Sequence, residues 1–217
     1  MRKLELTTGE YYHVFNRGVG KKKIFCDNRD KIRFLFLVLY HQSPSTFYNL
    51  SRQVSYFVKH QVFNISIEEI GGIVSGRFVS VVAFALMENH FHLILRQEQD
   101  GGVSKYMQKI GNSCAKYFNT KYKEVGHLFQ SPFKAVHLES NEQLLYASAY
   151  IHRNPRELPG WKNREQDYPW SSFGDYIREN RWLTLLDQSI LLEQFGDKGD
   201  YVKFVEENPA KEGELLE

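Results

Sequence analysis

The sequence predicts an α+β fold in which one antiparallel sheet carries helices on one face, followed by a small helical C-terminal tail. Two observations support this prediction. Four short segments have the composition of strands, and three longer segments have the apolar spacing of helices, in the order β-α-β-β-α-β-α. A chain of 217 residues with 42% apolar and 25% charged residues is also typical of a globular protein, which excludes disordered and fibrous classes.

The N-terminal part contains the first predicted strand and the first predicted helix. Residues 11–17 (YYHVFNR) alternate and are rich in aromatic and β-branched residues, which predicts a strand. Gly18-Val19-Gly20 and the three lysines that follow predict a flexible basic loop. Residues 27–40 begin with Asp and Asn, which cap helices, and continue with apolar residues at helical spacing, so we expect an amphipathic helix.

The next part of the chain contains a weakly patterned stretch and a strongly patterned one. Residues 41–75 are polar and Ser-rich. We expect a short helix at 51–60, and we expect Gly71-Gly72 to end the stretch. Residues 78–86 (FVSVVAFAL) are apolar on both faces, which predicts a central strand.

A hairpin is predicted directly after this strand. Met87-Glu88-Asn89 is short enough to join it to a second strand at residues 90–95 (HFHLIL). Residues 103–122 then predict a long helix, and residues 133–138 (FKAVHL) predict a further strand.

The last helix of the predicted core runs from a cap at Asn141 to Asn154, where Pro155 stops it. The complete order of elements is that of the split βαβ arrangement, which is ferredoxin-like or RRM-like. We expect residues 1–180 to form this domain and residues 181–217 to form an acidic helical tail.

No segment is apolar enough to predict a membrane span. The longest unbroken apolar runs, at 34–40 and 81–87, have seven residues each, where a span needs roughly 20. The N-terminus lacks the apolar core of a secretory signal. Cys26 and Cys114 match no metal or redox spacing. We therefore expect a reduced, cytoplasmic protein without a membrane partner.

Charge is unevenly distributed along the chain. Residues 187–217 carry nine acids and three lysines, net −6, which leaves residues 1–186 with net +8. A basic body suits a polyanion, because cations that meet phosphates release condensed counterions, although uneven charge can also serve solubility alone. Residues 103–134 combine six lysines with six aromatic residues, a mixture that suits single-stranded nucleic acid. Helical spacing equally predicts that some of these aromatic residues are core.

The His90-Phe91-His92 sequence is the sharpest local signal. Side chains in a strand alternate, so His90 and His92 should emerge on one face about 7 Å apart along the strand, close enough to share one cation. The alternative is a pair of ordinary strand histidines, one paired and one exposed. No cysteine or third histidine stands nearby in the sequence to complete a zinc site.

Tyr150 and Asn154 form a second signal. They are four residues apart on a predicted helix and therefore share one face. The Asn154 carbonyl oxygen is a hard ligand, and together with two imidazoles it would leave open positions on Mg²⁺ or Mn²⁺. Alternatively, Tyr146, Tyr150 and Asn154 form a polar stripe on an ordinary helix with Asn154 as its C-cap.

The two signals together favour one reaction. A metal held by His90, His92 and Asn154 would polarise a phosphodiester, Tyr150 would attack phosphorus, and a 3′-hydroxyl would leave. A phenol with an ordinary pKa of about 10 needs such a cation or a base to attack at neutral pH. The product would be a 5′-phosphotyrosine link, which forms without ATP and can be reversed to rejoin strands.

These motifs also resemble those of a known family, the single-tyrosine HUH transposases, in which HUH stands for His-hydrophobic-His. The chain is most similar to the REP-associated tyrosine transposases, over roughly residues 10–176. The resemblance is carried by YHVFNRG (12–18), ALMENHFHLIL (85–95), YFN (117–119), GHLFQSPFK (126–134), YIHRNP (150–155) and WSSF (170–173).

The resemblance implies an HUH nuclease core that cleaves single-stranded hairpin DNA during DNA transposition. It implies His90 and His92 as ligands of Mg²⁺ or Mn²⁺, Tyr150 as the nucleophile and Asn154 as the third ligand. A homodimer stays open, because insertion-sequence members are homodimers and repeat-associated members can be monomers. Charge and neighbourhood, rather than a motif, select the candidates for DNA contacts: Arg17, Lys21, Lys22, Lys23, Lys134, Arg153 and Arg156.

Some features depart from the family pattern. Relatives often have Pro where Glu88 stands, and its carboxylate could support a ligand, be a fourth ligand or be merely exposed. The stretch at 41–75 could read a hairpin or be a plain insertion, and the acidic tail could pack on the basic face. Two other functions also remain open: a non-catalytic hairpin-binding protein derived from a transposase, and a nickase for replication or conjugation.

Overall fold

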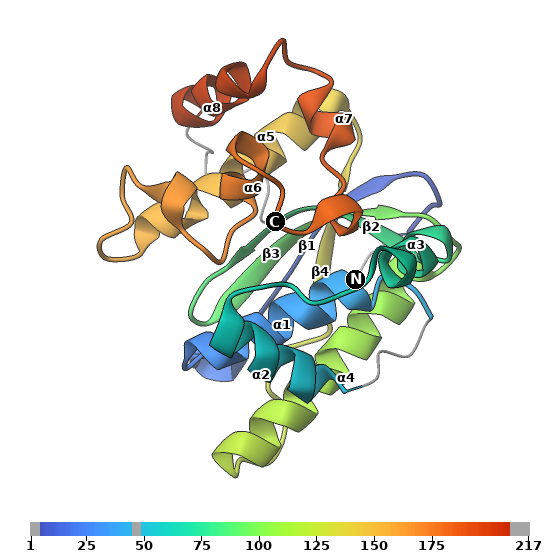
Figure 1. Ribbon diagram of the computed structural model, residues 1–217, viewed down its shortest axis with the longest axis vertical. Coiled ribbons are helices and arrows are strands. Elements are labelled where there is room, and N and C mark those ends of the chain that lie inside the picture. The colour runs from blue at the N-terminus through green and yellow to red at the C-terminus, as the bar shows by residue number, and fades with distance from the viewer. Residues whose placement is uncertain (1–4, 45–48, 209–217) are drawn as a thin grey trace.

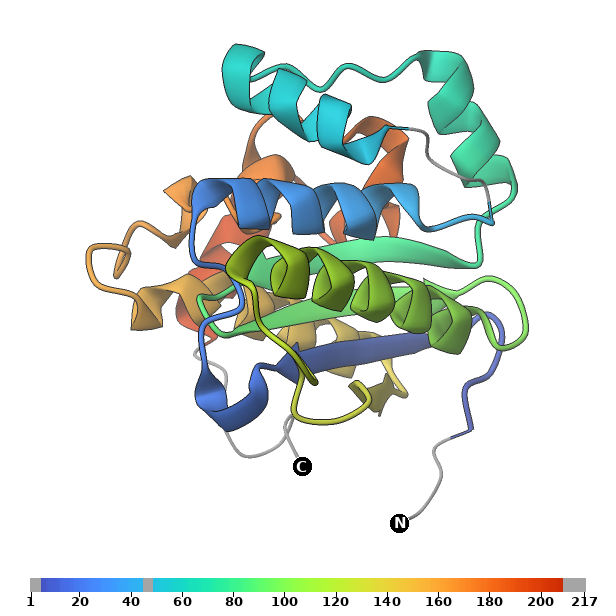
Figure 2. The same ribbon diagram turned by 90° about the horizontal axis from the view of Figure 1, so that it is seen from below.

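The structure is a computed structural model, which describes residues 5–44 and 49–208. A four-stranded sheet lies between two groups of helices (Figures 1 and 2). The strands are β1 (Tyr11–Arg17), β2 (Val79–Leu86), β3 (His90–Gln97) and β4 (Lys134–Leu138). They pair in the order β2-β3-β1-β4, and each neighbouring pair is antiparallel. This confirms the predicted α+β fold and the predicted hairpin.

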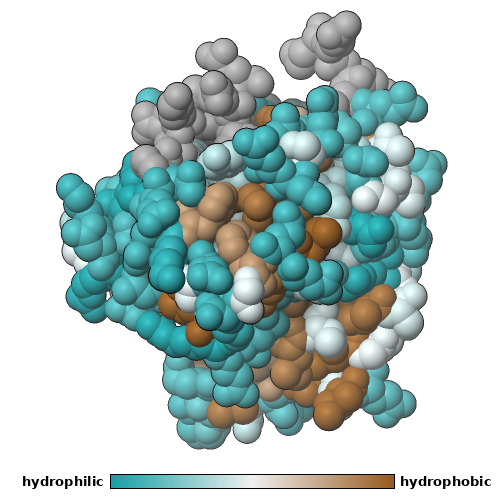
Figure 3. Space-filling model, turned by 90° about the horizontal axis from the view of Figure 1, so that it is seen from above, coloured by the Kyte–Doolittle hydropathy of each residue, from teal (hydrophilic) through white to brown (hydrophobic). Residues whose placement is uncertain are grey.

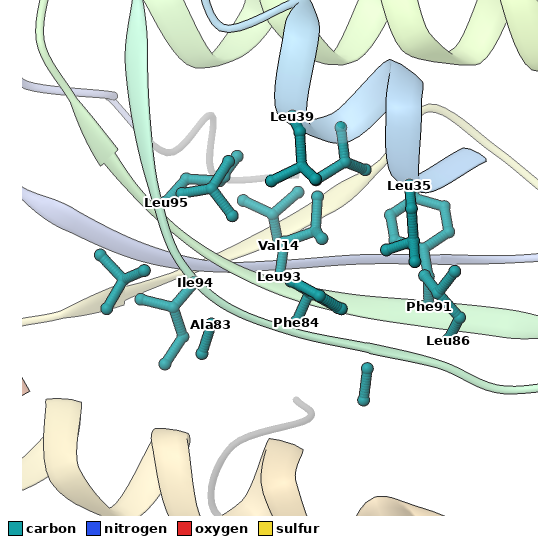
Figure 4. Packing of buried hydrophobic residues seen from close by; sticks show 14 of the residues in the cluster. Val14, Leu35, Leu39, Ala83, Phe84, Leu86, Phe91, Leu93, Ile94 and Leu95 are labelled. Atoms are coloured by element: carbon teal, nitrogen blue, oxygen red, sulfur yellow. The ribbon is translucent and has the colours of Figure 1, made fainter. Parts of the chain in front are cut away.

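Helices cover both faces of the sheet. α1 (Asn28–Tyr40) and α4 (Gly102–Tyr122) lie on one face, and α5 (Asn141–Arg153) lies on the other. The prediction that the helices share one face therefore holds for α1 and α4 and is wrong for α5. The reason is that the sheet is apolar on both sides, so each side needs a cover. Figure 4 shows Leu35 and Leu39 of α1 above the sheet, while Ile94 lies on the side of the helices below.

Capping residues set where these helices begin. The Asp27 side chain accepts a hydrogen bond from the backbone N–H of Asp30, and the Asp30 side chain accepts one from the backbone N–H of Asp27, which forms a capping box at the start of α1. At α5 the cap is Ser140, whose hydroxyl accepts from the backbone N–H of Gln143, so the prediction of Asn141 as the cap is wrong by one residue.

The stretch at 41–75 forms two helices outside α1, α2 (Leu50–His60) and α3 (Ile67–Ser75). The short helix expected at 51–60 is confirmed. Gly71-Gly72, expected to end the stretch, instead lies inside α3, because a capping box between Ser66 and Glu69 starts that helix just before the glycines. Residues 45–48 lie outside the described residues.

β2 is an edge strand, so the prediction of a central strand is wrong. All eight of its residues are nevertheless buried. Its outer edge is covered by two later segments, which make isolated bridges through Ser171 to Ala85 and through Leu186 to Val81. The backbone N–H of Leu86 also donates to the carbonyl of Trp170. β2 is apolar on both faces because α1 and α4 pack against one face and α5 packs against the other, as helices would over a central strand.

The C-terminal segment is packed into the body rather than appended to it. It contains α6 (Phe173–Ile177), α7 (Ser189–Leu192) and α8 (Lys198–Glu207), and α8 lies against α5. Tyr201 and Val205 of α8 are fully buried. The predicted boundary at 180/181 therefore does not coincide with a break in packing, and residues 209–217 of the predicted tail lie outside the described residues.

Short 3₁₀ helices lie at Val19–Lys21, Asn154–Glu157, Glu165–Asp167 and Leu183–Leu185.

The surface on the side of α8 is mainly hydrophilic, with apolar side chains in separate patches (Figure 3). Among the described residues, no helix is both long and apolar enough to cross a membrane.

Asp30 joins α1 to α4. Its carboxylate is buried and accepts hydrogen bonds from the Lys121 ammonium at 2.5 Å, from the Tyr122 hydroxyl at 2.7 Å and from the Tyr117 hydroxyl at 3.1 Å. The backbone N–H of Cys26 donates to it at 2.9 Å. Burial alone would raise the pKa of Asp30, but these donors outweigh it and lower the pKa.

We expect Asp30→Asn to lower the free energy of unfolding at pH 7 by roughly 2–3 kcal/mol, because it leaves the Lys121 ammonium without its buried partner. The loss should disappear as the pH falls through the lowered pKa of Asp30, since the wild-type carboxyl group is then uncharged, as the Asn amide is. Urea unfolding measures both effects. Asp27→Asn is the matched control: it keeps a capping side chain at an exposed site and should cost less than about 0.5 kcal/mol. Equal losses in the two variants would contradict this account.

Candidate active site

One face of the sheet presents the predicted histidines. His90 and His92 alternate with Phe91 on β3, so both imidazoles point toward α5, while Phe91 points into the core under α1. The two imidazole centroids lie 5.0 Å apart. The antiparallel register places Arg17 of β1 opposite His90 and Phe15 opposite His92.

α5 brings the predicted tyrosine to the same place. The ring centroid of Tyr150 lies 5.4 Å from that of His92, with the two rings edge to face. Asn154 follows one turn later, where α5 gives way to a 3₁₀ turn, and it is 4% exposed. Its amide is close enough to His90 to influence the pKa of that imidazole. The fold therefore brings together all four residues that the sequence singles out.

His90, His92 and Tyr150 line a pocket of about 210 Å³. Its position follows from one row across the sheet, in which Lys134, Phe15 and His92 are successive partners on β4, β1 and β3. The pocket is lined by Phe15, Asn16, Arg17, His90, His92, Gln130, Ser131, Lys134 and Tyr150.

Burial keeps both imidazoles uncharged. Burial, and then the Arg17 guanidinium, lowers the pKa of His90 to about 4. Burial, and then the His13 ring, lowers the pKa of His92 well below its ordinary value. Both are therefore neutral at pH 7, which is the form of imidazole that binds divalent metals.

The donor set fits a hard divalent cation. The Oδ1 atom of Asn154 is buried, and no described residue makes a hydrogen bond of good geometry to it. A buried carbonyl oxygen normally has a partner, and a cation would supply one. Two neutral imidazoles and one carboxamide oxygen can bind Mg²⁺ or Mn²⁺ and leave positions for water and substrate. Within the described residues, no cluster of three or more His, Cys, Asp or Glu could hold a metal, so a carboxylate-rich or thiolate-rich site is absent there.

The sequence alone misses His13. It lies on β1, is fully buried, and its Nε2 is 2.9 Å from Nδ1 of His92. The alternation of YYHVFNR could have shown that His13 shares a face with Phe15. Only the register of β1 against β3, however, reveals that this face is also that of His92.

Glu88 is exposed and forms an ion pair. Its carboxylate lies 2.8 Å from the Lys23 ammonium, and half of its side chain is exposed. It does not line the pocket, so of the three interpretations the exposed one fits the structure.

The predicted DNA-contact residues fall into different environments. Arg17 and Lys134 are exposed and line the pocket. Lys21 is exposed on the basic loop, where Lys22 pairs with Glu124 and Lys23 pairs with Glu88.

Arg153 is the last residue of α5, and Arg156 lies in the turn that follows. The Arg153 guanidinium donates to the carbonyls of Glu206 at 2.6 Å and Val205 at 3.3 Å, so it binds the C-terminal end of α8. Arg156 is half-buried in the following 3₁₀ turn.

A larger groove of about 1,270 Å³ adjoins the pocket, between α4 and the loop before β4. It shares the lining residues Asn16, Gln130 and Ser131 with the pocket, so the two are adjacent. Its lining mixes aromatic, amide and basic side chains: Phe129, Phe133, Gln108, Asn112, Lys22 and Lys105. Other aromatic residues of 103–134, such as Tyr106 and Phe118, are buried in the core, as helical spacing predicts.

His152 anchors the helix that carries Tyr150. Its Nδ1 lies 2.7 Å from the Tyr201 hydroxyl of α8, and its Nε2 lies 2.8 Å from the Ser172 hydroxyl. Ser172 in turn accepts from the backbone N–H of Phe84 on β2. Burial lowers the pKa of His152 to about 3, so this link between α8, α5 and the sheet is uncharged.

Comparison with known proteins supports the resemblance. Residues 51–154 match the family model described as transposase IS200 like, and this range contains His90, His92, Tyr150 and Asn154. A solved structure titled "Structure of the REP associates tyrosine transposase bound to a REP hairpin" matches with a TM-score of 0.54 and 14% identity, over 82% of this chain and 84% of that chain. No curated protein sequence matches. The match to the family model confirms the predicted resemblance to IS200-like transposases over these residues. The structural match shows that this chain shares the fold of the REP-associated tyrosine transposase.

The pKa of His152 predicts how stability depends on pH. In the unfolded chain this imidazole binds a proton below pH 6.5, whereas in the folded protein it stays neutral to about pH 3, so acid favours unfolding. We expect the stability advantage of the wild type over His152→Gln to shrink by about 2 kcal/mol between pH 7 and pH 5. Denaturant unfolding in EDTA at both pH values measures this. An advantage that does not change with pH would show that His152 is not held neutral.

Proposed function

We propose that this chain, with its IS200-like transposase match, is a metal-dependent endonuclease and strand transferase. It would cleave single-stranded DNA at hairpins through a 5′-phosphotyrosine link and act in DNA transposition. The observation that supports this most is the meeting of Tyr150 with His90, His92 and Asn154, which come from a strand and a helix far apart in sequence.

His90, His92 and Asn154 would hold Mg²⁺ or Mn²⁺. When bound, such an ion acts as a Lewis acid on a phosphodiester oxygen. The fit rests on the neutral imidazoles and on the buried Asn154 Oδ1 described above.

Tyr150 would be the nucleophile. Its phenol oxygen attacks phosphorus, the bond from phosphorus to O3′ breaks, and the 3′ oxygen leaves as a hydroxyl when it gains a proton. The proton lost by the phenol passes to water in the pocket. One phosphodiester replaces another, so the step needs no ATP, and attack by a 3′-hydroxyl reverses it. Arg17 and Lys134 line the pocket and would hold the phosphate charge in place.

The groove beside the pocket would take unpaired nucleotides next to the cleaved bond. At about 1,270 Å³ it exceeds the roughly 300–1,000 Å³ of pockets that enclose one small ligand, so it suits a chain-like one. Half-buried Phe129 and Phe133 offer faces for base stacking, and Gln108 and Asn112 offer amides to base edges. The solved relative is titled as bound to a REP hairpin, which supports hairpin DNA as the substrate class here.

We expect Tyr150→Phe to abolish covalent capture of DNA, because it removes the attacking oxygen and little else. Labelled hairpin oligonucleotides from palindromes beside the gene, mixed with protein and Mn²⁺, should give an adduct that survives SDS. Tyr150→Phe should lower the adduct by about 10³-fold or more while hairpin affinity stays within about twofold. Tyr146→Phe, an exposed tyrosine one turn earlier on α5, is the matched control and should keep the adduct.

Two outcomes would decide against this assignment. An adduct that persists in Tyr150→Phe and is lost in Tyr146→Phe would show that Tyr146, and not Tyr150, is the nucleophile. Tight hairpin binding without any adduct from the wild type would favour the non-catalytic hairpin-binding protein.

A substitution at Gly111 tests the groove. Gly111 lies on α4 and lines the groove, and a Cβ built on it meets no atom within 4 Å, so Gly111→Trp should fill the groove without harming the fold. We expect about tenfold weaker binding of hairpins that carry an unpaired flank, because stacking is worth about 1–3 kcal/mol per base. Binding of a bare hairpin should change less than about twofold.

Gly72→Trp is the matched control for this experiment. Gly72 is also a helical glycine with open space around its position, but it lies on α3 away from the groove. Fluorescence anisotropy with flanked and bare hairpins compares the two variants. Equal binding of flanked hairpins by both would place the unpaired nucleotides elsewhere.

A further inference from the structure

We propose that Asn89 and His13 are positioning residues that hold the two histidine ligands by their Nδ1 atoms and so turn both Nε2 atoms toward the metal. This inference rests on the proposed function, since it concerns the same ion. Neither residue belongs to the set of ligands and nucleophile named above.

Asn89 fixes the orientation of His90. The Oδ1 atom of Asn89 lies 2.6 Å from Nδ1 of His90, and its Nδ2 donates to the backbone carbonyl of Lys21 at 3.0 Å. A carbonyl can only accept, so the amide nitrogen must face Lys21 and the amide oxygen must face His90. That oxygen also can only accept, so the proton of neutral His90 is on Nδ1. The lone pair of His90 is therefore on Nε2.

His13 plays the same part for His92. Nε2 of His13 lies 2.9 Å from Nδ1 of His92 in a fully buried contact, and the two rings stack with centroids 5.1 Å apart. If His92 donates from Nδ1, its Nε2 is free of hydrogen and can bind a cation. In the opposite arrangement the proton of His92 is on Nε2, and that imidazole cannot bind a metal. His13 thus decides whether His92 is a ligand.

His13 does not act as a third ligand itself. It is fully buried and does not line the pocket, whereas His90, His92 and Tyr150 do. Within the described part of the chain, no group of three His, Cys, Asp or Glu could hold a metal, although three histidines lie close together. The structure therefore connects His13 to the ion through His92.

The experiment measures Mn²⁺ binding by the full chain without DNA, from the free Mn²⁺ signal in electron paramagnetic resonance. We expect Asn89→Leu and His13→Phe each to raise the Mn²⁺ Kd by about 10–100-fold, the usual cost of losing a partner that orients a metal ligand. His13→Gln, whose amide can still accept from Nδ1 of His92, should recover most of the affinity. His137→Phe is the matched control, because His137 is a strand histidine paired with Glu10 outside the pocket, and it should bind Mn²⁺ as the wild type does.

Imidazole ¹⁵N NMR of the metal-free protein gives a second readout that packing alone would not change. Wild-type His90 and His92 should both carry the proton on Nδ1. His13→Phe should move the proton of His92 to Nε2 and leave His90 unchanged. Asn89→Leu should move the proton of His90 to Nε2 and leave His92 unchanged. Circular dichroism and hairpin binding in EDTA show whether each variant is folded.

The results separate this proposal from the proposed function. If His90→Ala loses Mn²⁺ binding while Asn89→Leu and His13→Phe stay within twofold of the wild type, the positioning role is overturned and the metal site stands. The same holds if His13→Gln binds Mn²⁺ as weakly as His13→Phe. If the wild type binds no Mn²⁺ and forms no adduct, both proposals fail.

Discussion

The pairing of β1 with β3 is the constraint on which the candidate site depends. Side chains alternate along a strand, so a fixed register decides which residues of neighbouring strands share a face. Here the register sets Phe15 against His92 and Arg17 against His90. A slip of one residue would turn both imidazoles into the apolar core under α1. Phe91 and Leu93, the buried apolar residues that alternate with the histidines along β3, make such a slip costly because they would lose that core.

The site also depends on the second layer of helices. The sheet brings histidines and basic residues to one face, but the phenol and the carboxamide come from α5. α5 is held in place by a buried uncharged chain of hydrogen bonds from Tyr201 through His152 to Ser172, and by Arg153 on the end of α8. The acidic C-terminal segment is thus part of the scaffold that positions Tyr150. The acidic charge of this segment does not predict that role, because the contacts to α5 are made by Tyr201 and by backbone carbonyls.

Burial and charge act together at the pocket. Removing imidazoles from water penalises their charged forms, so burial keeps them in the state that can bind a metal. The cations that stay exposed and line the pocket, Arg17 and Lys134, add a positive field there. Arg153, a basic residue within the YIHRNP motif, has a structural contact instead, because its guanidinium caps the C-terminal end of α8.

The sequence by itself determined the order of the four strands with α1, α4 and α5, the His90–His92 pair on one strand face and the Tyr150–Asn154 pair on one helix face. Each of these follows from a local period of two or 3.6 residues, and the motifs added the family resemblance. Only the tertiary structure decided that α5 covers the opposite face from α1, that β2 is a covered edge, and that His13 meets His92. These depend on contacts between residues far apart in the chain, and local periodicity carries no information about which distant segment fills a given surface.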